Sequence, residues 1–138
     1  MNHYKYEEIE VGHTESFTVT VTEEAQNRFC EITGDVNPLH CDLVYAKELG
    51  YNQCVVFGML TASYLSALAG VYLPGERSLL HSVRTKFSKP VYAGDTLTVE
   101  GTVAEKNDTF NLLIVKAVIR NQDGVKVCKA ELQVGVRP

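Results

Sequence analysis

The chain has 138 residues, of which 45% are hydrophobic and 22% charged, and a formal net charge of −4. This composition is typical of one folded domain and excludes a disordered chain. The sequence shows no cluster of Lys and Arg, so nucleic acid is not an expected partner.

Targeting and redox features point to the cytoplasm. The first residues lack the apolar segment of a secretory signal. The most apolar stretch, residues 59–73, is too short and too rich in small residues for a membrane span, so no membrane partner is expected. The four cysteines lack metal-binding spacing, and we expect reduced thiols and no metal site.

The first part of the chain is predicted to form one strand and one helix. In residues 17–21, Phe and Val alternate with Thr, which is the period-two pattern of a half-buried strand. Thr20 or Thr22 can cap a helix that runs to about Ile32. Gly34 is suited to the left-handed conformation that ends many helices.

Three further segments precede the second half of the chain. Residues 35–40 are expected to be irregular, because their proline disfavours helical backbone at the residue before it. A short helix should follow, with Asp42 as its cap and Gly50 at its end. A longer helix, 58–72, is apolar on nearly every face, so protein must surround it.

The second half of the chain changes to a period-two pattern. Asp123 and Gly124 form a strong hairpin signal between the last two strands. We expect an antiparallel sheet wrapped around the long helix, which makes an α+β fold in a single domain spanning residues 1–138. The four predicted strands are residues 79–87, 96–104, 110–120 and 125–136.

Candidate catalytic chemistry lies in residues 34–40, Gly-Asp-Val-Asn-Pro-Leu-His. Asp35 and His40 lie five residues apart on a turn that Pro38 restricts, so both side chains can point at one water. Histidine ordinarily titrates near neutrality, which suits general acid–base chemistry. The alternative is structural, because Asp and Asn are common turn formers and a single His is usually solvated or structural.

A candidate oxyanion site follows at Gly58, where the long helix begins. The first N–H groups of a helix have no partner within the helix, and the helix dipole favours negative charge there. Glycine also allows a substrate carbonyl to approach the backbone closely. Alternatively, Gly58 only makes the tight turn from loop to helix.

Three segments resemble MaoC-like dehydratases, the R-specific enoyl-CoA hydratases with the hot-dog fold. They are residues 29–40, 58–63 and 87–95, and the resemblance covers nearly the whole chain. It implies a lyase that reversibly hydrates a trans-2-enoyl thioester to the (3R)-3-hydroxyacyl product. It also implies no metal or redox cofactor, since coenzyme A or an acyl-carrier protein enters with the substrate, and a homodimer.

The resemblance also implies roles for single residues. Asp35 and His40 would hold and activate water, with Asn37 as a neighbouring hydrogen-bonding residue. Gly58 would supply the oxyanion-hole N–H, and Ser66 would lie near the site. One position departs from the family pattern, because many relatives have His where this chain has Phe57. The change from His to Phe would alter the wall of the pocket, and therefore which substrate fits.

Further residues are candidates for substrate contacts. Helical spacing places Ala62, Ser66, Ala69 and Leu73 on one face, where small side chains would leave a groove for the acyl chain. Alternatively, these small residues let the helix pack close to the sheet. Lys86 and Lys89 could meet the phosphates of coenzyme A, or they could be ordinary solvated lysines.

Three alternatives remain open from sequence. A hot-dog acyl-CoA thioesterase would use a carboxylate on the long helix, but residues 59–73 contain no Asp or Glu. A non-catalytic acyl-thioester-binding module would not need both Asp35 and His40. In a purely structural domain, the turn chemistry would be coincidental.

Overall fold

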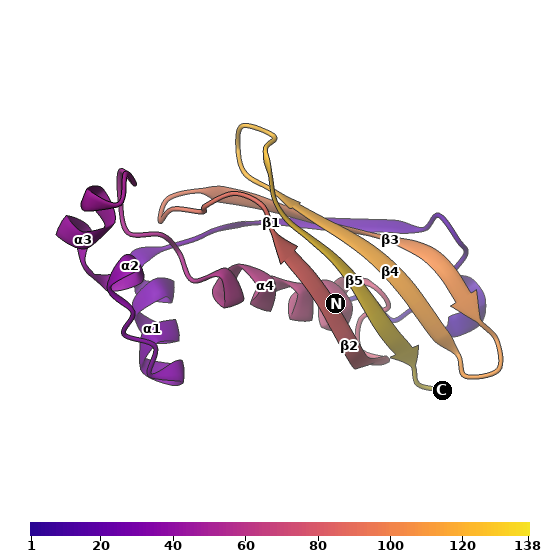
Figure 1. Ribbon diagram of the computed structural model, residues 1–138. Coiled ribbons are helices and arrows are strands. Elements are labelled where there is room, and N and C mark those ends of the chain that lie inside the picture. Colours follow the sequence, from indigo (N-terminus) through magenta and orange to yellow (C-terminus); the bar gives the residue numbers. More distant parts are fainter.

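A curved antiparallel sheet of five strands organises the chain, and the computed structural model describes residues 1–138 (Figure 1). The strand order across the sheet is β1-β3-β4-β5-β2, and the α+β prediction is confirmed. The predicted strands are present, with ends that differ by up to three residues. The strands are β1 (Thr14–Thr20), β2 (Ser78–Phe87), β3 (Thr96–Asn107), β4 (Leu112–Arg120) and β5 (Lys126–Val136).

The period-two pattern of the strands places one set of side chains in the core. In β4, Leu113, Val115, Ala117 and Ile119 are buried, whereas Lys116 between them is exposed. Successive side chains of a strand point to opposite faces, so one face of the sheet packs into the core and the other faces outward.

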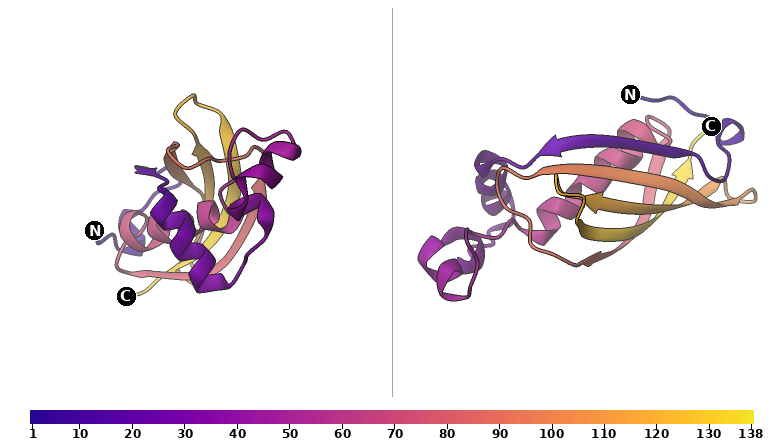
Figure 2. Two further views of the ribbon diagram at one scale, coloured as in Figure 1. Left: turned by 90° about the vertical axis from the view of Figure 1, so that its left-hand side faces the viewer. Right: turned by 90° about the horizontal axis from the view of Figure 1, so that it is seen from above.

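The central helix lies along the apolar face of the sheet (Figures 1 and 2). It consists of α4 (Gly58–Ala67) followed by a π-helical turn, η2 (Leu68–Tyr72). Its packing is close, because a Cβ atom on Gly101 of β3 would lie 2.7 Å from a methyl carbon of Leu68. The π turn corrects the expectation of one regular helix through Tyr72, since regular helical spacing ends at Ala67.

The remaining helices extend beyond one end of the sheet (Figure 1). As predicted, the Thr22 hydroxyl accepts a hydrogen bond from Ala25 N, and Gly34 has a φ of 72°. Asp42 also caps its helix as predicted, accepting from the N–H groups of the first turn. These helices are α1 (Glu23–Thr33), α2 (Pro38–Cys41) and α3 (Leu43–Glu48). A short 3-10 turn, η1 (Tyr6–Glu8), lies at the opposite end of the sheet (Figure 1).

The expectation that residues 35–40 are irregular is correct only for the first half of the segment. Asn37 is extended, with a ψ of 128°, as expected before proline, but Pro38 then begins α2. Proline is tolerated at the first helical position, because the missing N–H would have no partner there. His40 is therefore held on one turn of helix.

Strand β2 is an edge strand, and most of its residues are exposed. It pairs only with β5, so one side of its backbone has no strand partner. Exposed apolar side chains lie along it and on the adjoining helix α4. This "β2–α4 surface" consists of Met59, Leu80, Val83 and Phe87, which are 38–63% exposed.

None of the helices has the length and hydropathy needed to cross a bilayer.

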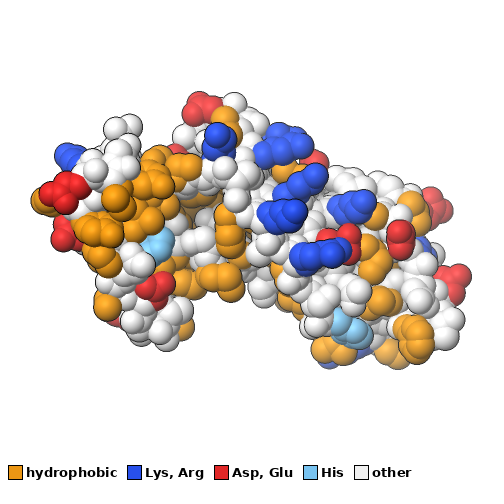
Figure 3. All heavy atoms as spheres, viewed as in Figure 1, with side chains coloured by type: hydrophobic (Ala, Val, Ile, Leu, Met, Phe, Trp, Pro, Cys, Tyr) orange, Lys and Arg blue, Asp and Glu red, His pale blue; other side chains and the backbone are white.

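A cluster of cations lies on the outer face of the sheet, although the sequence shows none (Figure 3). The strand register places Lys86 opposite Lys129 and Arg120 opposite Lys126. None of these four residues lies within 4.0 Å of a carboxylate. We call this group the basic surface. The sheet assembles it by bringing separate strands together.

Candidate active site

His40 is fixed by a hydrogen bond from its ring to the backbone. Its Nδ1 lies 2.7 Å from the carbonyl oxygen of Val55. A carbonyl can only accept, so Nδ1 carries the hydrogen and donates it. In the neutral ring, Nε2 then has a free lone pair and can accept a proton. The structure therefore presents one defined nitrogen of His40 for proton transfer.

Phe57 forms the wall against which the His40 ring packs. The two ring centroids are 4.2 Å apart, with a tilt of 32°. Phe57 is 2% exposed and also contacts Phe29 of α1, at 5.1 Å between centroids. Phe57, at the position where many relatives have His, thus shapes the space around the candidate base, His40.

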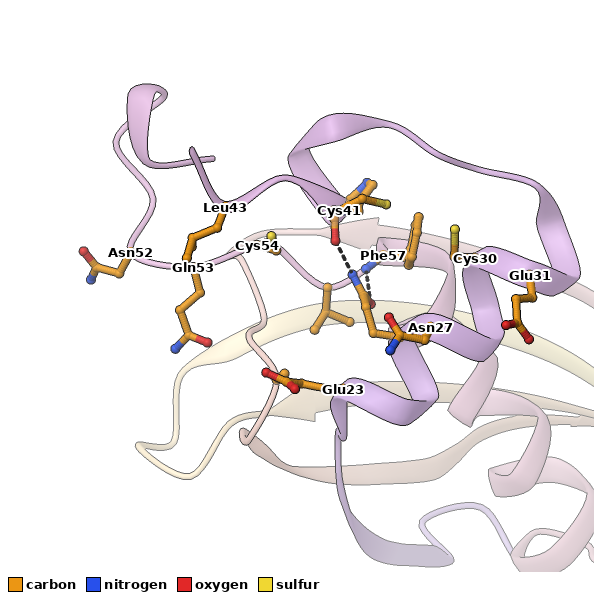
Figure 4. A pocket seen from close by; sticks show the side chains of 14 residues that line it. Glu23, Asn27, Cys30, Glu31, Cys41, Leu43, Asn52, Gln53, Cys54 and Phe57 are labelled. Carbon is orange, nitrogen blue, oxygen red and sulfur yellow. Dashed lines mark hydrogen bonds between the residues drawn. The ribbon is translucent and has the colours of Figure 1, made fainter. Parts of the chain in front are cut away.

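Gln26 is a positioning residue that the sequence interpretation missed. This buried side chain of α1 donates from Nε2 to Val55 O at 3.0 Å and to His40 O at 3.4 Å. Its Oε1 accepts from Phe57 N at 3.2 Å, and Figure 4 draws its contacts to His40 O and Phe57 N as dashed lines. Gln26 therefore ties the carbonyl that holds His40 to the start of α4. The one signal in the sequence is a polar residue on the inward face of α1.

Gly58 begins α4, as predicted, and no protein atom accepts a hydrogen bond from its N–H. A Cβ atom at this position would lie 3.3 Å from the ring of Phe87, so the site is narrow. Gly58 lines a cavity of 310 Å³ together with His40, Thr61 and Lys89. The structure thus brings the candidate base and the candidate oxyanion donor to one cavity.

His40 also lines a second, larger cavity of 710 Å³ (Figure 4). Phe57 and the thiols of Cys30, Cys41 and Cys54 also line it. Local burial raises the pKa of the Cys41 thiol, and the neighbouring Cys30 raises it further. No group of three or more His, Cys, Asp or Glu side chains is arranged to hold a metal ion.

Asp35 and Asn37 lie in the exposed turn between α1 and α2. Asp35 Oδ1 accepts from Asn37 N at 3.0 Å, and Asn37 Oδ1 accepts from Leu39 N at 3.0 Å. Both side chains therefore order the turn that presents His40. Neither residue lines the two cavities, so the single chain places only His40 of the predicted pair there.

Comparison with known proteins identifies the family. A family model described as "MaoC like domain" matches residues 7–123, which is most of the chain. The chain belongs to the MaoC-like family. This MaoC-like protein is 35% identical over 108 residues to an (R)-specific enoyl-CoA hydratase of Rhodospirillum rubrum, covering 75% of this chain and 74% of that relative. It is 32% identical over 103 residues to an (R)-specific enoyl-CoA hydratase of Aeromonas caviae, covering 75% and 77%.

Solved structures agree with the family assignment. The unliganded R-hydratase PhaJ1 of Pseudomonas aeruginosa superposes with a TM-score of 0.90 at 31% identity, over 96% of this chain and 85% of that one. An R-hydratase of Aeromonas caviae gives a TM-score of 0.88 at 29% identity, over 93% and 97%. The predicted hot-dog fold is confirmed.

The acyl groove predicted along the central helix of this MaoC-like chain does not form as expected. Ser66 is exposed, whereas Ala69 and Leu73 are only 2% and 1% exposed. The π turn after Ala67 breaks the regular spacing that would align these positions. Neither cavity is lined by Ala62, Ser66 or Ala69, so their contact with substrate stays a prediction.

Proposed function

We propose that this MaoC-like protein reversibly hydrates trans-2-enoyl-CoA to (3R)-3-hydroxyacyl-CoA. The observation that carries the proposal is one cavity lined by both His40, with its tautomer set by Val55 O, and Gly58, whose N–H has no protein acceptor. The names of the relatives, (R)-specific enoyl-CoA hydratases, support the same reaction.

In the proposed reaction, His40 and Asp35 act as an acid–base pair. Water loses a proton to the pair as its oxygen bonds to C3, and the pair delivers a proton to C2. The free Nε2 of His40 suits it to accept or donate this proton. Asp35 Oδ1 already accepts from Asn37 N, which leaves Oδ2 available to orient the water. The reaction adds the hydrogen and the hydroxyl of one water across C2 and C3 without net oxidation or reduction, so it requires no redox cofactor, and the roles assigned here require no metal.

Attack at C3 moves electrons through the conjugated system onto the thioester oxygen. The N–H of Gly58, at the positive end of the α4 dipole, is suited to stabilise that negative oxygen. Removing a single donor of this kind from an enzyme typically lowers kcat by about 10²–10³-fold. Gly58 therefore takes the role of oxyanion donor in this proposal.

The basic surface supports coenzyme A as the carrier. Lys89, which lines the smaller cavity, follows the end of β2, close in sequence to Lys86 of that surface. Cations attract phosphate groups, and charge of one sign around a site raises the local concentration of the oppositely charged substrate. We propose that Lys89 and the basic surface bind the phosphates of coenzyme A. Phe57, which lines the larger cavity beside His40, would contact the acyl part.

We also propose that two copies assemble through the β2–α4 surface. An unpaired edge strand offers backbone donors and acceptors to a second strand, and its exposed apolar residues gain from burial. Size-exclusion chromatography with light scattering should give the mass of a dimer, and Val83→Lys should shift the mass to that of a monomer.

The four free cysteines support a reducing location such as the cytoplasm.

A single assay separates hydration from its closest rival. With crotonyl-CoA, the enoyl-thioester absorbance should fall without release of free thiol. Thiol release in the same reaction would identify a thioesterase. An unchanged absorbance at high protein concentration would favour a binding module that does not turn over its ligand.

A further inference from the structure

Thr61 carries a buried hydroxyl group that has no hydrogen-bond partner. The residue is 2% exposed and lies one turn into α4. Threonine inside a helix commonly donates to the carbonyl four residues earlier, here Phe57 O. That carbonyl instead accepts from Leu60 N and Thr61 N, and Thr61 Oγ1 has no hydrogen-bond partner. Buried polar groups are nearly always paired, so this exception requires an explanation.

The position of Thr61 in the structure explains why its hydroxyl has no partner in the protein. It lines the 310 Å³ cavity together with Gly58 and His40. Residues three apart on a helix are neighbours on one face, so the hydroxyl lies on the same side of α4 as Gly58. Gly58 has an N–H group without an acceptor. Two residues that line one cavity therefore each carry a donor without a protein acceptor.

We propose that the Thr61 hydroxyl is a second donor to the thioester oxygen of the substrate, beside the Gly58 N–H. This role rests on the proposed hydration reaction. As the water oxygen bonds to C3, the C2–C3 π electrons form a C1–C2 π bond, and the C1–O π electrons move onto the oxygen. The hydroxyl keeps its proton and donates a hydrogen bond to that negative oxygen. When C2 takes its proton, the carbonyl forms again.

The proposal predicts opposite effects on activity and stability. Thr61→Val is nearly isosteric, because it replaces the hydroxyl with a methyl group. The kcat for crotonyl-CoA should fall by about 10²-fold, as for other oxyanion donors, with little change in KM. The Tm should rise, because the variant no longer buries an unpaired polar group. Thr61→Ser keeps a hydroxyl and should keep most of the kcat. If Thr61 had only a structural role, the loss of kcat would not be accompanied by a rise in Tm.

Thr20→Val is a matched control, because the Thr20 hydroxyl bonds to Thr96 on the exposed part of the sheet. Its kcat should equal that of the wild type. A Thr61→Val variant with wild-type kcat, or one that changes KM alone, would overturn the role of Thr61 and leave the hydration reaction standing. A wild-type protein that hydrates no enoyl thioester would overturn the proposed function and this role together.

Discussion

Replacing Gln26 with Met should damage stability and activity together. Methionine has a similar length and shape but cannot hydrogen-bond to the three backbone groups that Gln26 contacts. The Phe57 N–H would be left buried and unpaired, which costs about 1–3 kcal/mol, and the lost donor to Val55 O costs about 1 kcal/mol more. The free energy of unfolding should therefore fall by about 2–4 kcal/mol. For a chain of this size, Tm should fall by about 8–16 °C.

The effect on activity follows from the link between Gln26 and His40. Val55 O holds the His40 ring, and Gln26 holds Val55 O. A displacement of a catalytic group by about 1 Å can lower the rate ~10²-fold, so kcat should fall by about 10–100-fold. The assay is hydration of crotonyl-CoA at a temperature where circular dichroism shows the variant to be folded.

The matched control is Gln133→Met, which makes the same change on an exposed side chain of β5. It should leave Tm and kcat unchanged. The reasoning is refuted if the folded Gln26→Met variant retains wild-type kcat, or if its Tm matches that of the control.

Three further predictions concern the pair, the basic surface and a thiol. Asp35→Asn and His40→Gln should each lower kcat by about 10²–10⁴-fold, and the double variant should lose little more than the worse single one, as measured by crotonyl-CoA hydration. Lys86→Glu faces Lys129, so it should replace a repulsive pair with an attractive one. We expect urea unfolding to show a gain of about 0.2–1 kcal/mol, together with a higher KM for crotonyl-CoA. Cys41 is exposed but its pKa is raised, which lowers the thiolate fraction, so iodoacetamide should alkylate it more slowly than glutathione at the same pH, with the rate rising at higher pH.

Local sequence signals predicted most of the elements, because their causes are local. Thr22 bonds to an N–H three residues away, and Gly34 needs only its own backbone freedom to end α1. Alternating apolar residues predicted β4 and β5, since each buried side chain faces the same core. Pro38 departs from the local prediction because proline disfavours helix at the residue before it but is itself suited to the first position of a helix.

The contacts that hold the site in place were not predictable in the same way, because they join segments that are distant in the sequence. Gln26 bonds to backbone atoms 14 to 31 residues away, and backbone atoms carry no residue-specific signal. The basic surface combines cations of three strands, which only the sheet register brings together. The π turn after Ala67 has no local marker, and it removed the shared face expected for Ala62 and Ala69.

The stereochemistry of hydration tests the central claim most directly. Purified protein should be incubated with crotonyl-CoA, and the product should be offered to dehydrogenases specific for each enantiomer of 3-hydroxybutyryl-CoA. The account predicts that only the R-specific dehydrogenase oxidises the product. An S product, or no hydrated product at all, would contradict it.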